Sequence, residues 1–319
     1  MNPPRFEPML ATTWRLPFAD PEWWFEPKWD GIRGVITWDG SSTAIHTRGG
    51  NEVSARYPEL AMALSVPCVL DGEIVSFDEG RPSFQRLQTR MHRLDQAGDP
   101  SGRVSFIAFD LLWLDGRGLT TLGLEERLGM LGGLDLPDSF QRTDPVRGDG
   151  LALWDAVVER DLEGMVAKRA ESLYRPGRRS VDWRKIHHEH TARALVGGFT
   201  HGEGGRSSSF GSLVLGQWDG LGLRWVGNVG TGFDETSMRA VRGALDEMRR
   251  STSPFHRDPE MPEATWVEPS LVAAVSYRNW TTGGRLRFPV FKGFTDEDPD
   301  AVTWETEGPQ GRGAPPAPA

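Results

Sequence analysis

Short β-prone runs, each closed by a glycine- or proline-containing turn, recur along almost the whole chain. Its 319 residues include Gly 38 and Pro 23. Both residue types end regular elements and build turns, so we expect many short strands rather than long helices. The length suits one large domain or two ordinary ones. Hydrophobic residues make up 38% and charged residues 25% of the chain, which allows a buried core beneath a polar surface.

Strands and helices alternate in the first part of the sequence. Residues 31–38 and 43–48 are β-prone and flank the turn Asp39-Gly40-Ser41, which predicts a hairpin. Residues 68–77 are predicted to form a second hairpin. The apolar run over 104–112 indicates a buried strand, and 165–168 a short one. The helices that we expect lie at 57–64, 84–91, 124–131 and 151–161.

The pattern changes near Thr191, where short strands with glycine-rich turns begin. One helix is predicted at 235–249. The strands are predicted at 194–199, 212–218, 223–229, 266–277 and 285–291. Several short strands and one helix in roughly a hundred residues are typical of a small barrel of the OB type. The last residues, 306–319, are rich in Pro, Gly and Ala and are predicted to be disordered.

Several classes of protein are disfavoured by what the chain lacks. No apolar run is long enough to span a bilayer, and residues 1–5 lack a signal-peptide core. Cys68 is the one cysteine, so neither a disulfide framework nor a cysteine-based zinc site is expected. We therefore expect a soluble, cytoplasmic protein with no membrane partner.

The net charge of −9 argues against a protein that coats nucleic acid nonspecifically. A local basic groove remains compatible with this value, because net charge averages over the whole surface. Arginines are in fact clustered. The two clusters are Arg86, Arg90 and Arg93, and Arg175, Arg178, Arg179 and Arg184. A solvated face is the alternative for each cluster, but it is less favoured for the second cluster, which borders a second lysine-containing motif.

The run Lys28-Trp29-Asp30-Gly31-Ile32-Arg33 places an amine, a carboxylate, a glycine and an arginine between two β-prone segments. A free lysine titrates near ~10.4, and its ammonium form cannot attack an electrophile. Nearby cations or partial burial would favour the neutral, nucleophilic amine. Taken alone, however, this run is more typical of a charged surface turn.

Further motifs follow in a fixed order. They are Thr47-Arg48-Gly49-Gly50, Asp71-Gly72-Glu73, Phe109-Asp110-Leu111-Leu112, Glu163-Gly164-Met165-Val166-Ala167-Lys168 and Asp182-Trp183-Arg184-Lys185-Ile186. Together with the Lys28 run they resemble the covalent nucleotidyltransferases, namely ATP-dependent DNA ligases, RNA ligases and mRNA capping enzymes. The segments Val196-Gly197-Gly198-Phe199-Thr200, Gly202-Glu203-Gly204-Gly205-Arg206 and Val229-Gly230-Thr231-Gly232-Phe233 are similar to bacterial end-joining ATP-dependent DNA ligases.

The resemblance covers almost the whole chain and implies an α+β fold. Residues 1–190 would form a nucleotidyltransferase (adenylation, ATP-grasp-like) domain with antiparallel sheets and helices. Residues 191–305 would form an OB-fold β-barrel domain. In this family a lysine attacks the α-phosphorus of ATP and carries AMP as a phosphoramidate. AMP then passes to the 5′-phosphate of a nick, and the 3′-hydroxyl displaces it.

The resemblance also implies roles for individual residues. Lys28 would be the nucleophile. Glu26 would contact the adenine edge, although a plain surface acid is the alternative. Arg33 and Arg48 would hold the ribose and the phosphates, or the 5′-phosphate of the nick, because a guanidinium fork binds oxyanions at two points.

The remaining predicted roles concern the base, the metal and the α-phosphate. Phe109 would stack on adenine, although an aromatic residue ending a buried strand is usually core, and Val166 would cover the opposite face. Glu73 would bind the ribose or the metal, and Glu163 would help to hold Mg²⁺ or Mn²⁺. The cations at the α-phosphate would be Lys168 and Lys185.

Two departures from the family pattern bear on ATP use. The last core motif of the family commonly contains two lysines, the second two residues after the first. Here Lys185 is the first lysine, and His187 stands at the position of the second. The family's late basic motif closes over the β- and γ-phosphates, but 294–299 is acidic here. The candidates to replace it are Arg285, Arg287 and Lys292. We hypothesise slow self-adenylation, or a preference for substrates that are already adenylated.

The sequence therefore predicts a monomeric two-domain ATP-dependent DNA ligase that seals 5′-phosphate/3′-hydroxyl nicks in double-stranded DNA, in DNA repair. NAD is not expected as the AMP donor. Ligases that use NAD carry an extra domain before the lysine to hold the nicotinamide half, but only 27 residues precede Lys28 here. They also usually carry a cysteine zinc site, which is not expected in this sequence. The alternatives are an RNA ligase or capping enzyme, and a nucleotide- or DNA-binding homologue with weakened self-adenylation. A DNA end-binding protein or a repair polymerase is the expected protein partner. Association with the nucleoid is expected while the enzyme is on DNA.

Overall fold

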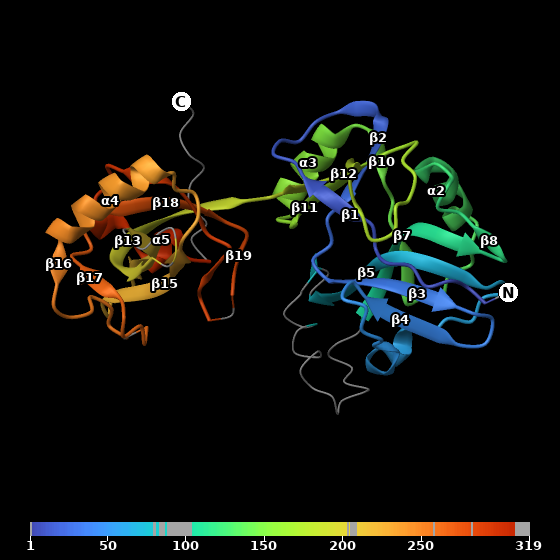
Figure 1. Cartoon of the computed structure of the whole chain (residues 1–319), viewed down its shortest axis with the longest axis horizontal. Helices are drawn as coiled ribbons and strands as arrows, with labels where there is room; N and C mark the ends of the chain where they lie inside the picture. The colour runs from blue at the N-terminus through green and yellow to red at the C-terminus, as the bar shows by residue number, and fades with distance from the viewer. Residues whose placement is uncertain are drawn as a thin grey trace. The chain divides into compact units, whose positions relative to one another are not determined.

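The computed structural model describes residues 2–78, 81–82, 87, 104–202, 204, 209–257, 259–281 and 283–309. The chain divides into two compact units, Met1–His188 and Glu189–Ala319 (Figure 1). Three predictions lie outside the described residues: most of the helix at 84–91 with its arginine cluster, most of the segment 202–206, and the tail from 310 onward. None of the described helices is both long and apolar enough to cross a membrane.

A five-stranded sheet in the first unit has the order β1-β12-β11-β2-β10. Its strands are β1 (Leu10–Thr13), β2 (Asp20–Pro27), β10 (Val146–Gly148), β11 (Gly164–Arg169) and β12 (Arg179–His187). Helix α3 (Gly150–Glu159) packs on β2 and β11. The core of this layer includes Phe25, Val157, Met165 and Ile186, all essentially buried. β11 lies between β2 and β12, so residues from three distant segments come side by side.

The second sheet of this unit has the main order β4-β3-β5-β7-β8. Its strands are β3 (Ile32–Trp38), β4 (Thr43–Thr47), β5 (Cys68–Asp78), β6 (Arg81–Pro82), β7 (Val104–Leu114), β8 (Arg117–Gly118) and β9 (Phe140–Arg142). Helix α2 (Leu124–Gly132) packs on β7. β6 and β9 pair with β5 and β7 beside the main path.

The β3–β4 hairpin is confirmed, with Asp39 accepting the backbone N–H groups of Ser41 and Ser42 in the turn. The hairpin predicted at 68–77 is wrong, because β5 runs through it as one strand. Gly72 leaves no room for a side chain, because a Cβ at this position would lie 2.4 Å from the Ile107 carbonyl oxygen. An Asp-Gly pair therefore allows close strand contact here rather than a turn.

The helix predicted at 57–64 is also wrong. Its first part forms only a short 3₁₀ turn, Pro58–Leu60, preceded by a second one, Ser54–Arg56. The chain then becomes extended at Ala61. Pro58 fixes the start of the turn and lacks an N–H group, and Ala61 leaves the helical region immediately afterward.

The second unit is built on one seven-stranded sheet with the main order β15-β14-β13-β17-β16, and β18 joins β13 to β21. The strands of this unit are β13 (His190–His201), β14 (Phe210–Trp218), β15 (Leu223–Val229), β16 (Arg249–Arg250), β17 (Thr265–Val267), β18 (Val272–Tyr277), β19 (Asn279–Trp280), β20 (Leu286–Arg287) and β21 (Val290–Thr295). Helix α4 (Glu235–Glu247) contributes Met238, Val241 and Leu245 to the core.

Three predicted limits in this unit need correction. The strand predicted at 266–277 is divided into β17 and β18 around Pro269, which cannot donate to a ladder. The strand predicted at 285–291 is divided at Phe288, whose φ is +55°. The tail predicted from 306 overlaps α5 (Trp304–Glu307), which ends in a buried Glu307 that binds Arg193.

Candidate active site

A pocket of about 240 Å³ lies in the first unit, with walls from both of its sheets. The structure brings together there every residue predicted to be the nucleophile or to bind the nucleotide. These residues are Glu26, Lys28, Arg33, Arg48, Glu73, Phe109, Val166, Lys168 and Lys185. The sequence reasoning did not single out Trp183, which also lines the pocket and lies within the last motif.

Lys28 directly follows β2 and faces Glu163, the residue before β11. Its Nζ lies 2.5 Å from Glu163 Oε2, and about a fifth of each side chain is exposed. The Lys28 backbone N–H donates to the Gly164 carbonyl at 2.9 Å. Gly164 has φ +145°, and a Cβ there would lie 2.1 Å from the Ile186 carbonyl oxygen. The glycine therefore allows the close strand pairing that sets Glu163 beside Lys28, with His187 Nδ1 3.8 Å from the other carboxylate oxygen.

Lys168 and Glu26 form a nearly buried ion pair across the β2–β11 ladder, with Nζ 2.6 Å from Oε1. Burial raises the pKa of Glu26, and the Lys168 ammonium opposes that rise. The ammonium also donates to the Phe109 carbonyl at 3.2 Å and lies 4.1 Å from the centre of the Phe109 ring. A further aromatic contact joins it to Trp183, at 4.5 Å. Lys168 is thus a fixed cation against the aromatic wall of the pocket.

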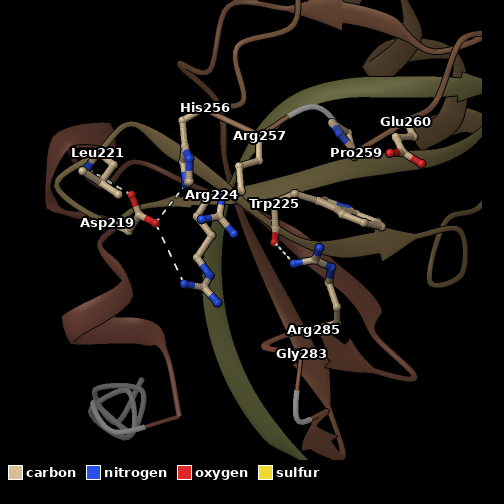
Figure 2. Close-up of a pocket in the computed structure, with 10 residues that line it drawn as sticks. All are labelled: Asp219, Leu221, Arg224, Trp225, His256, Arg257, Pro259, Glu260, Gly283 and Arg285. Carbon is tan, nitrogen blue, oxygen red and sulfur yellow. Dashed lines mark hydrogen bonds and ion pairs between the residues drawn. The ribbon is translucent and has the colours of Figure 1, made fainter.

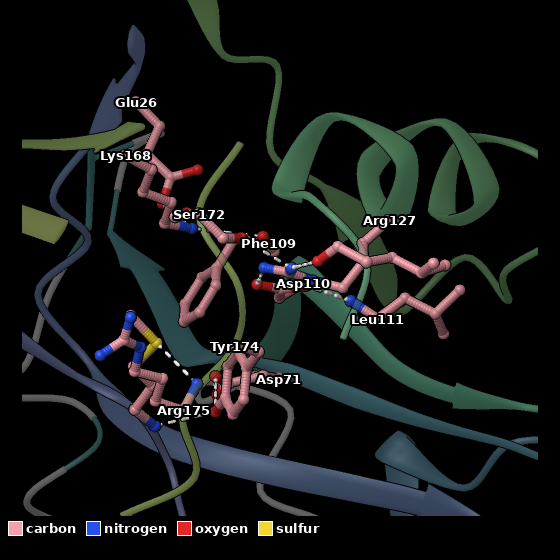
Figure 3. A network of polar contacts seen from close by, with 12 residues as sticks. Glu26, Asp71, Phe109, Asp110, Leu111, Arg127, Lys168, Ser172, Tyr174 and Arg175 are labelled. Carbon is pink, nitrogen blue, oxygen red and sulfur yellow. Dashed lines mark hydrogen bonds and ion pairs between the residues drawn. The ribbon is translucent and has the colours of Figure 1, made fainter. Parts of the chain in front are cut away.

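Arg33 is held by a buried acid. Its Nε and Nη2 donate to the two carboxylate oxygens of Asp71, each at 2.6 Å. Asp71 also accepts the Tyr174 hydroxyl at 2.6 Å (Figure 3). That hydroxyl accepts the Met9 backbone N–H at 2.9 Å. Burial by itself would lower the pKa of Arg33, but Asp71 outweighs it and raises that pKa. The guanidinium therefore stays charged, 4.4 Å from the Phe109 ring centre.

Asp110, next to Phe109, makes a second buried pair, with Arg127 of α2. The guanidinium Nε and Nη2 donate to the carboxylate at 2.7 and 2.8 Å, and both side chains are fully buried (Figure 3). Arg127 also donates to the carbonyls of Leu122 and Ser172. This pair ties β7, α2 and the segment before Tyr174 together, so it holds the Phe109 wall in place.

Tyr174 and Arg127 belong to none of the predicted motifs. Asp71 and Asp110 do, and from the sequence they are expected to shape turns and orient neighbouring side chains rather than to perform chemistry. The available signal was an acid inside each apolar strand, since a buried carboxylate needs a buried donor. Nothing in the sequence pattern indicates which donor that is, because the partner lies far away in the chain.

Glu73 faces Arg33 across the β3–β5 ladder. Burial raises the pKa of its carboxyl group to about 8, with Glu163 and Asp71 adding to the rise and the Arg33 and Lys28 cations opposing it. Two partly buried carboxylates, Glu73 and Glu163, therefore lie near one another and repel. Such a set of oxygen donors fits a hard divalent cation, which would relieve that repulsion.

The acidic stretch that departs from the family pattern has partners of its own in the second unit. Glu297 forms an ion pair with Arg193, and Asp298 caps a 3₁₀ turn by accepting the Asp300 backbone N–H. Of the candidate replacements, Lys292 lies 3.5 Å from Glu189, and Arg285 lines a separate pocket.

Comparison with known proteins identifies the family. A family model described as the ATP dependent DNA ligase domain matches residues 8–187, more than half of the chain. A second, described as the ATP dependent DNA ligase C terminal region, matches residues 206–298. The chain belongs to the ATP-dependent DNA ligase family. The DNA ligase prediction is thereby confirmed and favoured over the RNA ligase and capping-enzyme alternative.

Individual relatives agree with this family assignment. The multifunctional non-homologous end joining protein LigD of Mycolicibacterium smegmatis is 40% identical over 95% of the chain. The chain spans only 40% of that protein's length. The SPbeta prophage-derived DNA ligase-like protein LigB of Bacillus subtilis is 31% identical, and the match covers 89% of the chain and 97% of LigB.

A solved structure of mycobacterial DNA ligase D, complexed with ATP and MES, is 34% identical to this chain and superposes with a TM-score of 0.54. The match covers 93% of this chain and 98% of that one. The predicted fold class, an α+β adenylation domain followed by an OB-fold domain, is confirmed. The roles assigned to single residues, and the domain limits at 190 and 305, stay predictions.

Proposed function

We propose that this chain seals 5′-phosphate/3′-hydroxyl nicks in duplex DNA with ATP, through AMP bound covalently to Lys28. The observation that carries the proposal is the Lys28 ammonium, 2.5 Å from the Glu163 carboxylate, in a pocket also lined by Arg33, Arg48 and Lys185. An amine beside a carboxylate, facing several cations, is the arrangement that attack on a nucleotide phosphate requires.

Three transfers follow from this assignment. Lys28 Nζ gives up a proton, for which Glu163 is the adjacent acceptor, and forms a bond to the α-phosphorus of ATP as the bond to the pyrophosphate oxygen breaks. A 5′-phosphate oxygen of the nick then attacks the phosphorus of the AMP group, and the lysine nitrogen leaves. Finally the 3′-hydroxyl oxygen attacks the 5′-phosphorus, and AMP leaves as the DNA backbone closes.

The pocket residues would position the nucleotide for these transfers. Phe109 and Val166 would cover the two faces of adenine, with the chain around Glu26 at the base edge. The Glu26–Lys168 pair supports this view, because it fixes the wall beneath the base. The same pair holds Lys168 in position, so that its positive charge would act on the α-phosphate.

Three further side chains would bind the charged part of ATP. Arg33, Arg48 and Lys185 line the same pocket and would hold the ribose and phosphate oxygens. Preorganised cations stabilise the charge that develops on the phosphoryl oxygens in the transition state. Asp71 and Tyr174 keep the Arg33 guanidinium aligned for that purpose.

Glu73 and Glu163 would hold a divalent cation, Mg²⁺ or Mn²⁺. Two partly buried carboxylates near one another suit a hard cation, and the partial burial of Glu73 makes that charge compensation favourable. When bound, the cation would supply positive charge to the phosphate oxygens of the nucleotide.

The biological setting is proposed from the relatives. LigD is named as an end-joining protein, and this chain matches 40% of its length. We propose that nicked or broken double-stranded DNA is the substrate during repair, and that an end-binding protein or a repair polymerase assists.

The test is nick sealing with ATP and Mg²⁺ or Mn²⁺, together with mass spectrometry of the protein. Lys28→Ala should abolish both the AMP adduct and overall sealing, and Lys28→Arg should do the same although it keeps the charge. Arg117→Ala, at an exposed position on β8, should leave both unchanged. A nicked RNA duplex serves as the second substrate. An adduct that persists in Lys28→Ala, or faster sealing of RNA than of DNA, would contradict the proposal.

A further inference from the structure

A second pocket, of about 410 Å³, lies entirely within the second unit. Three arginines from separate segments line it: Arg224 from β15, Arg257 from the segment after α4, and Arg285 from the segment before β20. In Figure 2 their guanidinium groups lie around the middle of the pocket, whereas the Glu260 carboxylate points away from it. The pocket therefore gathers cations that are widely spaced in the sequence.

Two of these guanidinium groups are held in place by tryptophans. Arg285 stacks on Trp225 with 3.8 Å between its Cζ and the ring centre, and its Nη1 donates to the Trp225 carbonyl at 2.5 Å. Arg224 stacks on Trp304 at 4.0 Å. Stacking leaves the edge of each guanidinium available for hydrogen bonds and reduces the entropy lost on binding a ligand.

The positive charge of the pocket is only partly balanced. Asp219 Oδ2 lies 3.0 Å from His256 Nε2. Arg224 Nη1 is 4.0 Å from the same oxygen, which is too far for a hydrogen bond. Within the described ranges Arg285 makes no ion pair, and Arg224 Nε is buried without a hydrogen-bond acceptor. Burial lowers the pKa of Arg285, and the neighbouring Arg224 lowers it further. Arg224 and Arg285 are adjacent cations with little negative charge beside them, so a bound anion would stabilise both.

We propose that this second-unit pocket binds a phosphate group through Arg224, Arg257 and Arg285. Guanidinium forks match the tetrahedral oxyanion of a phosphate and bind it at two points each. The phosphate comes either from a nucleic-acid backbone or from a free ligand such as inorganic pyrophosphate, since both present the same oxygens. The site goes beyond the sealing reaction proposed above, and it is measurable without ATP or metal, so its failure and the failure of sealing are distinguishable.

The experiment compares the full-length wild-type protein with Arg224→Gln/Arg285→Gln, in EDTA and without ATP. The control is Arg239→Gln, which removes an exposed cation from α4 of the same unit. Fluorescence anisotropy measures binding of a nicked duplex over a series of salt concentrations. Calorimetry measures the number of inorganic pyrophosphate molecules bound. Thermal melting monitored by circular dichroism checks that each variant is folded.

If the phosphate belongs to DNA, the double variant should bind duplex roughly tenfold more weakly, and the slope of log K against log salt should fall by about one to two. If it belongs to a free ligand, DNA binding should stay the same while one pyrophosphate site disappears. Either result supports the pocket, as does loss of both. Unchanged binding of both probes, or losses that Arg239→Gln reproduces, would overturn it.

A second variant guards against misfolding of the first. Arg257 is exposed, so Arg257→Gln should keep the fold while removing one of the three cations. It should weaken the same probe that the double variant weakens, roughly threefold, with a slope change of about one or less. Arg285→Lys should recover only part of the binding, because an ammonium keeps the charge but loses the fork. Full-strength binding by Arg257→Gln would count against the proposal.

Discussion

The first-unit pocket around Lys28, here called the adenylation pocket after its proposed role, has charged side chains that are held by groups outside its lining. Asp71 is fully buried and gives both carboxylate oxygens to Arg33, while Tyr174 donates its hydroxyl to the same acid. Arg33 is a flexible side chain that would otherwise lose rotamer freedom on binding a phosphate. The acid and the tyrosine remove that freedom in advance, which is the usual route to a preorganised site.

Removal of the Tyr174 hydroxyl tests this arrangement. Tyr174→Phe keeps the ring against Trp183 but leaves the Met9 N–H and one Asp71 oxygen without that hydroxyl. We expect a loss of about 1–2 kcal/mol in the free energy of unfolding. Lysine adenylation should slow roughly tenfold because Arg33 is less well aligned. Urea unfolding and single-turnover labelling with ATP measure the two effects.

Tyr57→Phe is the matched control, since Tyr57 is equally buried and packs in the core of the second sheet. It should lower stability without slowing adenylation. Equal slowing in both variants would mean that the rate follows stability alone, and no slowing in Tyr174→Phe would mean that Arg33 needs no second support.

At the scale of elements, local signals predicted strands well and turns unevenly. The Asp-Gly pair at 39–40 forms a turn because the chain there is exposed. The same pair at 71–72 lies inside β5, where Gly72 packs against the Phe106 ring and the Ile107 carbonyl. The two cases differ only in what surrounds them, and those surroundings come from β7, some 35 residues onward. Sequence patterns read over a short window cannot contain that information.

Gly72→Ala tests whether space, rather than backbone conformation, explains this glycine. A Cβ would lie 2.4 Å from both the Ile107 oxygen and the Phe106 ring, so β5 and β7 must move apart. We expect a loss of about 1–3 kcal/mol in the free energy of unfolding. Gly118→Ala on β8 meets nothing within 4 Å and should change stability by less than about 0.5 kcal/mol. Urea unfolding of both variants decides it, and equal effects would contradict the steric explanation.

At the scale of the whole molecule, the sequence predicted the residues of the adenylation pocket but not the second-unit pocket. The adenylation pocket was predictable because its residues sit in short motifs that recur in a known family in a fixed order. The arginines of the second-unit pocket come from three segments with no shared motif. These three arginines come together only when β15 and the segments around residues 257 and 285 fold against one another. The net charge of −9 therefore does not indicate a local cluster of cations.

The acidic stretch at 294–299 is also clearer in the structure. Glu297 and Asp298 have local structural partners, Arg193 and the 3₁₀ turn after them. Asp296 is exposed, and no such partner is found for it within the described parts of the chain. The stretch is therefore compatible with a stable fold, while it lacks the cations that its family counterpart brings to the β- and γ-phosphates. Slow loading of Lys28 is the expected consequence.

Asp296→Lys tests that consequence. The new ammonium stands in the stretch where the family carries its basic motif, and it leaves the Arg193–Glu297 pair intact. Wild-type protein should seal a pre-adenylated nick faster than it labels Lys28 with AMP. The variant should label Lys28 roughly tenfold faster, because added positive charge stabilises the departing pyrophosphate. Its sealing of pre-adenylated nicks should not change, since no pyrophosphate leaves in that step. Asp138→Lys makes the same charge change at an exposed site in the first unit and should leave labelling as it was. Wild-type labelling as fast as sealing, or equal gains in both variants, would show that the acidic stretch does not limit loading.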